Sequence, residues 1–71
     1  MTYTRLRALR TEAGMTQLEA ASLSSVHPSR ISALEHGRVR GGVGELVRLA
    51  AALDYDGDPA GLMEATDDDT A

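Results

Sequence analysis

Residues that start or end helices occur at short intervals along this chain, and they limit it to short helices. Thr16 and Glu19 have the capping-box spacing, in which each side chain binds the other residue's backbone amide at a helix start. Pro28 suits the first turn of a helix, because an amide hydrogen at that position would have no helical partner. Gly14 and Gly37 suit helix ends, where a left-handed residue is common. The sequence therefore predicts three short helices, over residues 4–13, 16–24 and 28–36.

The second half of the chain predicts two more helices after a glycine-rich connection over residues 38–44. A fourth helix runs from there to about residue 53, with apolar residues at three- and four-residue steps that would face the core. These residues are Val43, Leu46, Leu49, Ala50 and Leu53. Pro59, with Asp58 as its cap, predicts a last short helix that buries Leu62 and Met63. No stretch has the pattern of a strand, so we expect an all-α fold of five helices.

Charge is distributed unevenly along the 71 residues. All seven basic residues are arginines within residues 1–53, where four acidic residues leave a net charge of +3; seven acidic residues and no basic residue follow. This asymmetry fits a basic binding body with an acidic tail, although the acids could serve only to keep the tail soluble. We expect one domain over residues 1–64 and a flexible acidic tail over residues 65–71.

Residues 16–35 contain two of the predicted helices, which are joined by a turn of about three residues. Ala21 is small enough for the first helix to approach its partner closely, and Val26 can fill the turn. Ile31 and Leu34 form the inward pair of the second helix. This combination predicts a helix-turn-helix, whose second helix can lie in the major groove of DNA.

The same residues and their neighbours resemble the Cro and phage-repressor type of helix-turn-helix, which is also called the xenobiotic-response-element family. The resemblance is carried by Leu9, Arg10, Gly14, Met15, Thr16, Gln17, Ala21, Val26, Ser29, Arg30, Ile31, Ser32, Glu35, His36 and Gly37. It continues through the apolar residues of the fourth helix and covers residues 4–64. It implies a compact five-helix lambda-repressor-like bundle that binds double-stranded DNA, usually as a homodimer.

The resemblance also implies DNA-contacting residues. Thr16 and Gln17 match the positions where the second helix presents its N-terminus to a phosphate. The recognition helix, residues 28–36, would face base edges or flanking phosphates, and Arg30 could bind a guanine through two parallel hydrogen bonds. The implied contacts of this region are His27, Pro28, Ser29, Arg30 and Ala33. His36, Arg38 and Arg40 match the region where the family contacts the phosphate backbone.

Two further implied roles do not involve DNA. Arg10 and Glu35 match the positions of an ion pair that ties the first helix to the end of the third. Tyr55, Leu62 and Met63 lie in the C-terminal part that the family often uses for dimerisation. A small domain with few large residues would gain stability by burying them in a dimer.

The chain departs from the family pattern in and around the second helix. Ala20 and Ser24 replace larger aliphatic residues, and Ser25 replaces the turn glycine, so it must adopt a left-handed backbone. Leu18 and Leu23 occupy positions that are normally polar, where they either repack the core or remain exposed to a partner. An alternative function is therefore a protein-interaction module on the same fold, such as an antitoxin or regulatory partner that uses these leucines and the acidic tail.

We expect a transcriptional regulator that represses from a palindromic operator. An enzyme is not expected, because the sequence offers no set of nucleophile, base and metal ligands for one pocket. The acidic run from Asp54 to Asp58 lacks the glutamate that a calcium loop carries at its twelfth position, and cysteine is absent. We therefore expect no metal and no cofactor. The absence of a long apolar run argues against a membrane span, and we expect a cytoplasmic protein.

Overall fold

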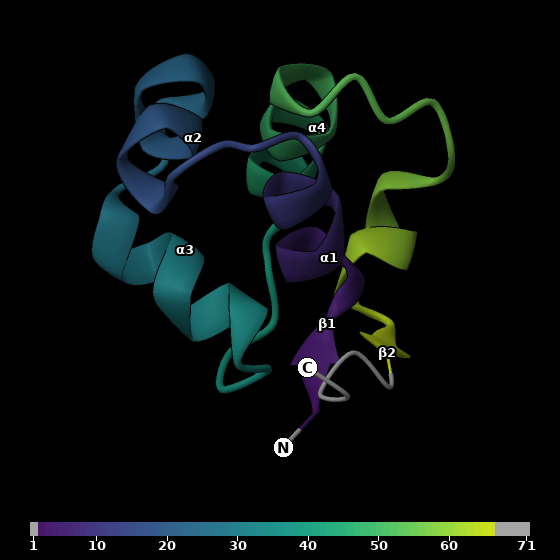
Figure 1. Ribbon diagram of the computed structural model, residues 1–71. Coiled ribbons are helices and arrows are strands. Elements are labelled where there is room, and N and C mark those ends of the chain that lie inside the picture. Colours follow the sequence, from purple (N-terminus) through teal and green to yellow (C-terminus); the bar gives the residue numbers. More distant parts are fainter. Residues whose placement is uncertain (1, 67–71) are drawn as a thin grey trace.

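Helices pack around one core in the computed structural model of the protein, which describes residues 2–66 (Figure 1). In chain order the elements are β1 (Tyr3–Thr4), α1 (Arg5–Glu12), α2 (Gln17–Ser24), α3 (Pro28–Glu35), α4 (Val43–Ala52), the 3-10 helix η1 (Pro59–Met63) and β2 (Ala65–Thr66). The mostly helical fold agrees with the prediction. The predicted fifth helix is a single 3-10 segment, which Asp58 caps by accepting the amide of Ala60. None of the helices in residues 2–66 has the length and apolar character needed to cross a membrane.

The prediction that the chain contains no strand is wrong. Tyr3 and Thr4 pair with Thr66 and Ala65 in an antiparallel ladder, at the bottom of Figure 1. The Thr66 hydroxyl donates to the Tyr3 carbonyl, and the Arg5 amide donates to the Glu64 carbonyl. Two-residue strands are too short for an alternating pattern, which is why no strand was predicted at either end. Residues 65 and 66 thus pack on the domain, and the rest of the predicted acidic tail lies outside the described residues.

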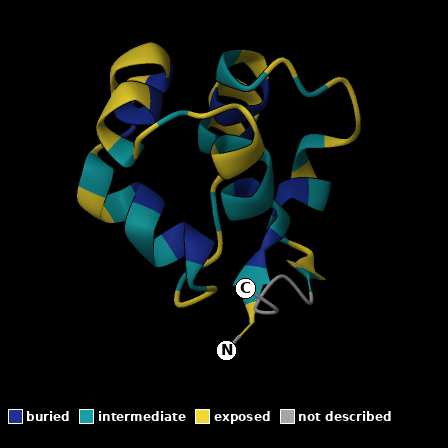
Figure 2. Cartoon of the chain, in the orientation of Figure 1, coloured by how far each residue is buried: buried dark blue, intermediate teal, exposed yellow. Residues whose placement is uncertain are grey.

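The core collects apolar side chains from every helix (Figure 2). Its buried members are Leu6, Ala20, Ala21, Val26, Ile31, Leu34, Leu46, Leu49, Ala50 and Leu62. Ser24 is buried among them because its hydroxyl donates to the Ala20 carbonyl. Val43 does not face the core as predicted. It is the first residue of α4 and is 80% exposed, because the packed part of this helix begins one turn later at Leu46.

Ser25 ends α2 with a left-handed backbone, at φ 60°. A side chain in this conformation costs about 1–2 kcal/mol, and glycine avoids that cost but loses more chain entropy on folding. We therefore expect Ser25→Gly to raise the free energy of unfolding by about 0.5–1 kcal/mol in urea denaturation. Ser22→Gly makes the same chemical change at an exposed position inside α2; it is the control and should lower the free energy of unfolding by about 0.5 kcal/mol. If both variants changed the free energy of unfolding in the same direction, the strain at Ser25 would be contradicted.

Candidate nucleic-acid interface

The second helix of the α2–turn–α3 unit has one side in the core and one side in contact with solvent. Ile31 and Leu34 anchor α3 inside, and Val26 fills the turn. On the other side, Ser29 is exposed and Ala33 is half-buried. α3 begins where the sequence predicts, with Pro28 in its first turn and His27 as its cap. The structure thus presents α3 in the way that a major-groove helix requires.

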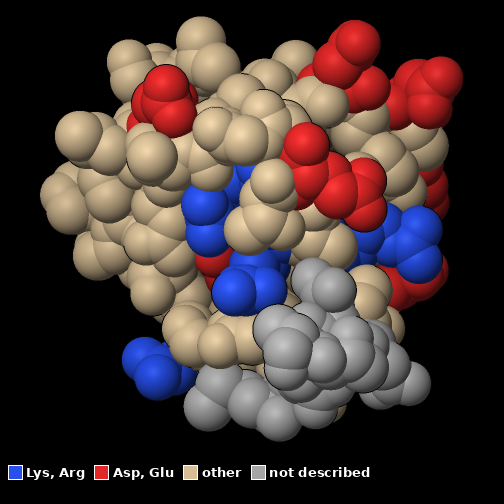
Figure 3. All heavy atoms as spheres, viewed as in Figure 1, with Lys and Arg blue, Asp and Glu red and all other residues tan. Residues whose placement is uncertain are grey.

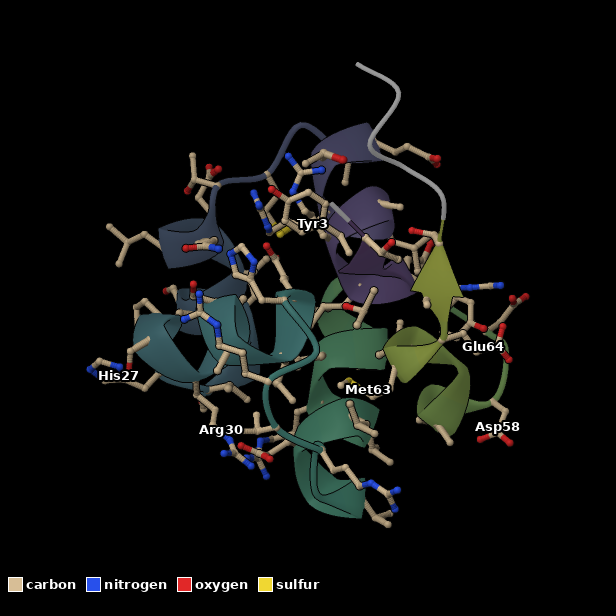
Figure 4. All side chains as sticks on the ribbon, turned by 90° about the horizontal axis from the view of Figure 1, so that it is seen from below. Tyr3, His27, Arg30, Asp58, Met63 and Glu64 are labelled. Atoms are coloured by element: carbon tan, nitrogen blue, oxygen red, sulfur yellow. The ribbon has the colours of Figure 1, made fainter. Side chains whose placement is uncertain are left out.

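His27 forms the cap through its ring. The Ser29 amide donates to Nδ1 of His27 at 3.1 Å, and the Ser29 Oγ lies 2.8 Å from the same nitrogen. The imidazole is exposed and lies at the N-terminal end of α3, on the outside of the molecule (Figure 4). His27 and Ser29 therefore act as one polar unit at the start of this helix.

Thr16 and Gln17 lie at the N-terminus of α2 and have different surroundings. The capping box predicted for Thr16 is present: its hydroxyl accepts the Glu19 amide at 3.0 Å, and the Glu19 carboxylate accepts the Thr16 amide at 2.8 Å. The side-chain amide of Gln17 donates to Oε1 of Glu35 at 3.0 Å. Thr16 is exposed, whereas Gln17 is directed toward an ion pair at the end of α3.

That ion pair joins Arg10 of α1 to Glu35 of α3. Nε of Arg10 lies 2.5 Å from Oε2 of Glu35, and Nη2 lies 3.1 Å from Oε1. Arg10 also donates to the Met15 carbonyl at 2.7 Å. The Glu35 side chain is only 2% exposed, so its charge depends on these partners for stabilisation. The cluster fixes the end of α3 against α1 and the start of α2.

A second ion pair, which the sequence did not indicate, holds Arg30 against α4. Nε and Nη2 of Arg30 donate to the two carboxylate oxygens of Glu45, at 2.8 and 3.0 Å. Nη2 also donates to the Arg40 carbonyl at 3.3 Å. Glu45 accepts the Gly42 amide at 2.9 Å as well, which caps the start of α4. The hydrogen bonds from Arg30 and Gly42 lower the pKa of Glu45 from its usual 4.5 to about 2, and the same pair raises the pKa of Arg30.

The segment after α3, residues 36–42, carries Arg38 and Arg40 with exposed side chains. Gly41 lets this segment pack closely on the core, since a Cβ there would lie 2.7 Å from Cδ2 of Leu46. The segment follows α3 directly. Its Arg38 amide donates to the Ala33 carbonyl and its Arg40 carbonyl accepts from Arg30, so the backbone of both arginines lies beside α3. Exposed arginines beside a groove-binding helix are suited to phosphate contacts.

His36 lies at the opposite end of α3 from His27, beside Tyr3. The His36 and Tyr3 ring centroids are 5.1 Å apart, and the Arg7 guanidinium carbon lies 3.9 Å from the Tyr3 ring centroid. Sequence reasoning missed Tyr3 and Arg7 because their positions beside α3 depend on the packing of β1 and α1 against that helix. Figure 3 shows basic atoms near the centre of this face, over α1 and α3, and acidic atoms at the upper right, over the connection from α4 to η1.

The predicted dimer residues differ in how far the structure buries them. Leu62 is fully buried in the core, so its side chain cannot contact a partner, and this part of the prediction is wrong. η1 packs against α1 and α4, which accounts for the burial. Tyr55 and Met63 are half-buried at the edge of the core.

The fold and the exposed side of α3 together define the class of helix-turn-helix proteins. A family model described as a helix-turn-helix domain matches residues 4–62, and the chain belongs to this family. Domains of this class bind DNA through the second helix of the motif, so the family supports a DNA-binding regulator. Comparison with curated proteins and with solved structures found no match.

Proposed function

We propose that the protein is a transcriptional repressor that binds a palindromic duplex operator as a homodimer. The observation that carries the proposal is the placement of α3, which buries Ile31 and Leu34 and keeps Ser29 exposed between the turn and the arginine-bearing segment 36–42. An operator with two-fold symmetry would place one such helix in each of two successive major grooves.

In this proposal the contacts fall into two groups. Base edges or flanking phosphates are contacted from the start of α3, by the residues His27, Pro28, Ser29, Arg30 and Ala33. Phosphates are contacted by Thr16 and Gln17 at the start of α2 and by His36, Arg38 and Arg40 after α3. Ser29 can donate or accept a hydrogen bond at a base edge, and Ala33 can contact a thymine methyl group.

The face that we assign to the homodimer includes Tyr55 and Met63. In addition, an apolar groove of about 230 Å³ lies between α4 and η1, and its lining includes Val43, Val47, Pro59 and Ala60. Val47 is half-exposed and Val43 largely exposed, so burial of this surface between two copies would remove apolar area from water. Sedimentation of the free protein measures this association directly.

The test of the proposed function is the salt dependence of duplex binding. With about four to six phosphate contacts per dimer, the plot of log affinity against log salt should have a slope of about −4 to −5. Fluorescence anisotropy with a duplex from the region upstream of the protein's own reading frame gives this slope, and selection from a random duplex pool gives the operator. Absence of duplex binding at low salt would rule the proposed function out.

A second candidate function is supported by two exposed leucines on α2. Leu18 and Leu23 are 70% and 64% exposed, so they do not repack the core. In this alternative, α2 docks on a protein partner, as an antitoxin docks on its toxin. The variant L18S/L23S separates the two functions: it should keep duplex binding in full, and lose co-purification with a co-expressed partner only if the alternative holds.

A further inference from the structure

Arg30 is the sole basic residue of α3, and the rest of the exposed side of this helix is uncharged. A recognition helix of this composition depends on one guanidinium for any charge-assisted contact with DNA. That guanidinium already has partners within the chain, since two of its nitrogens donate to Glu45 and one of these also donates to the Arg40 carbonyl. Whether Arg30 is paired within the chain or available to DNA therefore affects how strongly α3 can bind a duplex.

Glu45 is well placed to control whether Arg30 is available to DNA. It lies on the first turn of α4, where the Gly42 amide holds its carboxylate in position, and both of its oxygens face Arg30. Figure 4 shows Arg30 directed from α3 toward α4, away from the end of α3 that Tyr3 contacts. The pair lies beside residues 40–42, within the segment that we assign to phosphate binding.

The pair is accessible to a competing anion. The side chains of Arg30 and Glu45 are 39% and 22% exposed, and an ion pair with that much solvent contact contributes little net stability. A duplex phosphate could therefore replace the carboxylate as the partner of Arg30. The carboxylate opposes the exchange, because it stays ionised at neutral pH and repels an incoming phosphate.

We propose that Glu45 is a positioning residue that competes with a backbone phosphate for Arg30 and thereby lowers the affinity of the recognition helix for DNA. This inference rests on the proposed function, which supplies the duplex. It implies that the protein carries a built-in limit on its own affinity, in the form of one carboxylate fifteen residues away in sequence from the arginine that it neutralises.

The test is the variant Glu45→Gln, which removes the charge and keeps a side-chain oxygen for the Gly42 amide. We expect the slope of log affinity against log salt to steepen by about 0.9 per protomer, because one more arginine becomes available to a phosphate. At low salt the affinity should rise by about tenfold or more, as one added charge-assisted hydrogen bond predicts. Thermal unfolding followed by circular dichroism checks that the variant is folded.

Two further variants separate this effect from a general change in charge. Glu12→Gln makes the same change in net charge at an exposed position at the end of α1 and should leave both affinity and slope nearly unchanged. In the Arg30→Ala background, Glu45→Gln should not steepen the slope and should give a much smaller gain in affinity, since the arginine that it releases is absent. A gain of equal size in that background, or a wild-type slope in Glu45→Gln, would overturn the inference. The proposed function would still stand in that case, as long as the wild-type protein binds the duplex. If wild-type protein and all variants fail to bind duplex, the proposed function and this inference fail together.

Discussion

Glu35→Gln is expected to lower the free energy of unfolding by about 3–5 kcal/mol, which is the effect of removing one partner from a buried ion pair. The Glu35 carboxylate accepts from Nε and Nη2 of Arg10 and from the Gln17 side chain, and it is almost completely buried. The variant leaves the Arg10 charge without its counterion in a site that is itself only 12% exposed. A domain of this size has a total stability of about 4–10 kcal/mol, so much of it should be lost.

The control for this prediction is the exposed ion pair between Arg5 and Glu64. These groups are 2.9 Å apart, and their side chains are 41% and 63% exposed, so Glu64→Gln should cost less than about 1 kcal/mol. Urea denaturation followed by circular dichroism measures both variants under one condition. Equal losses in the two variants would mean that burial of Glu35 does not determine its contribution.

The double variant Arg38→Ala, Arg40→Ala is expected to show the largest loss of DNA affinity. Both side chains are exposed in the segment after α3, and in a homodimer the variant removes four cations from the proposed interface. If each makes one phosphate contact, the salt slope should become shallower by about 3 to 4, and the affinity at low salt should fall by about 100-fold or more. Each single variant should give about half of the change in slope.

Arg48→Ala tests whether charge alone explains that loss. Arg48 is an exposed arginine of α4 that lies outside the segment 36–42, and its Nε donates to the Ser24 carbonyl at 3.0 Å. It should change the slope by much less than Arg38→Ala does, although each removes one positive charge. Similar effects at all three arginines would show that the affinity for DNA depends only on net charge, and the segment 36–42 would then have no specific role.

Local signals predicted the part of the fold that they control. The cap of α2 at Thr16, the start of α3 at Pro28 and the cap at Asp58 follow from the backbone needs of single turns, and the structure shows each of them. The left-handed Ser25 was expected from the resemblance, whose pattern has a glycine there, and the structure shows it as well. The inward positions of Ile31 and Leu34 follow from helical periodicity. These are the features that make the α2–turn–α3 unit recognisable in the sequence.

Contacts between distant residues were not predictable in the same way. The bond between Arg30 and Glu45 depends on how α4 is set against α3, and within the sequence Glu45 shows only the spacing of a cap for Gly42. The burial of Leu62 depends on η1 folding back onto α1 and α4. A short apolar helix has the same sequence pattern whether it completes the core of its own chain or contacts a partner. The pattern therefore could not show which of these roles Leu62 has.

The pairing of β1 with β2 also supports the C-terminal turn of α3. Thr4 pairs with Ala65, and its hydroxyl donates to the Leu34 carbonyl at 3.1 Å, so a single threonine joins the ladder to the last carbonyls of that helix. Loss of the ladder would therefore loosen the residue whose hydroxyl satisfies a terminal carbonyl of α3, next to the Tyr3–His36 contact.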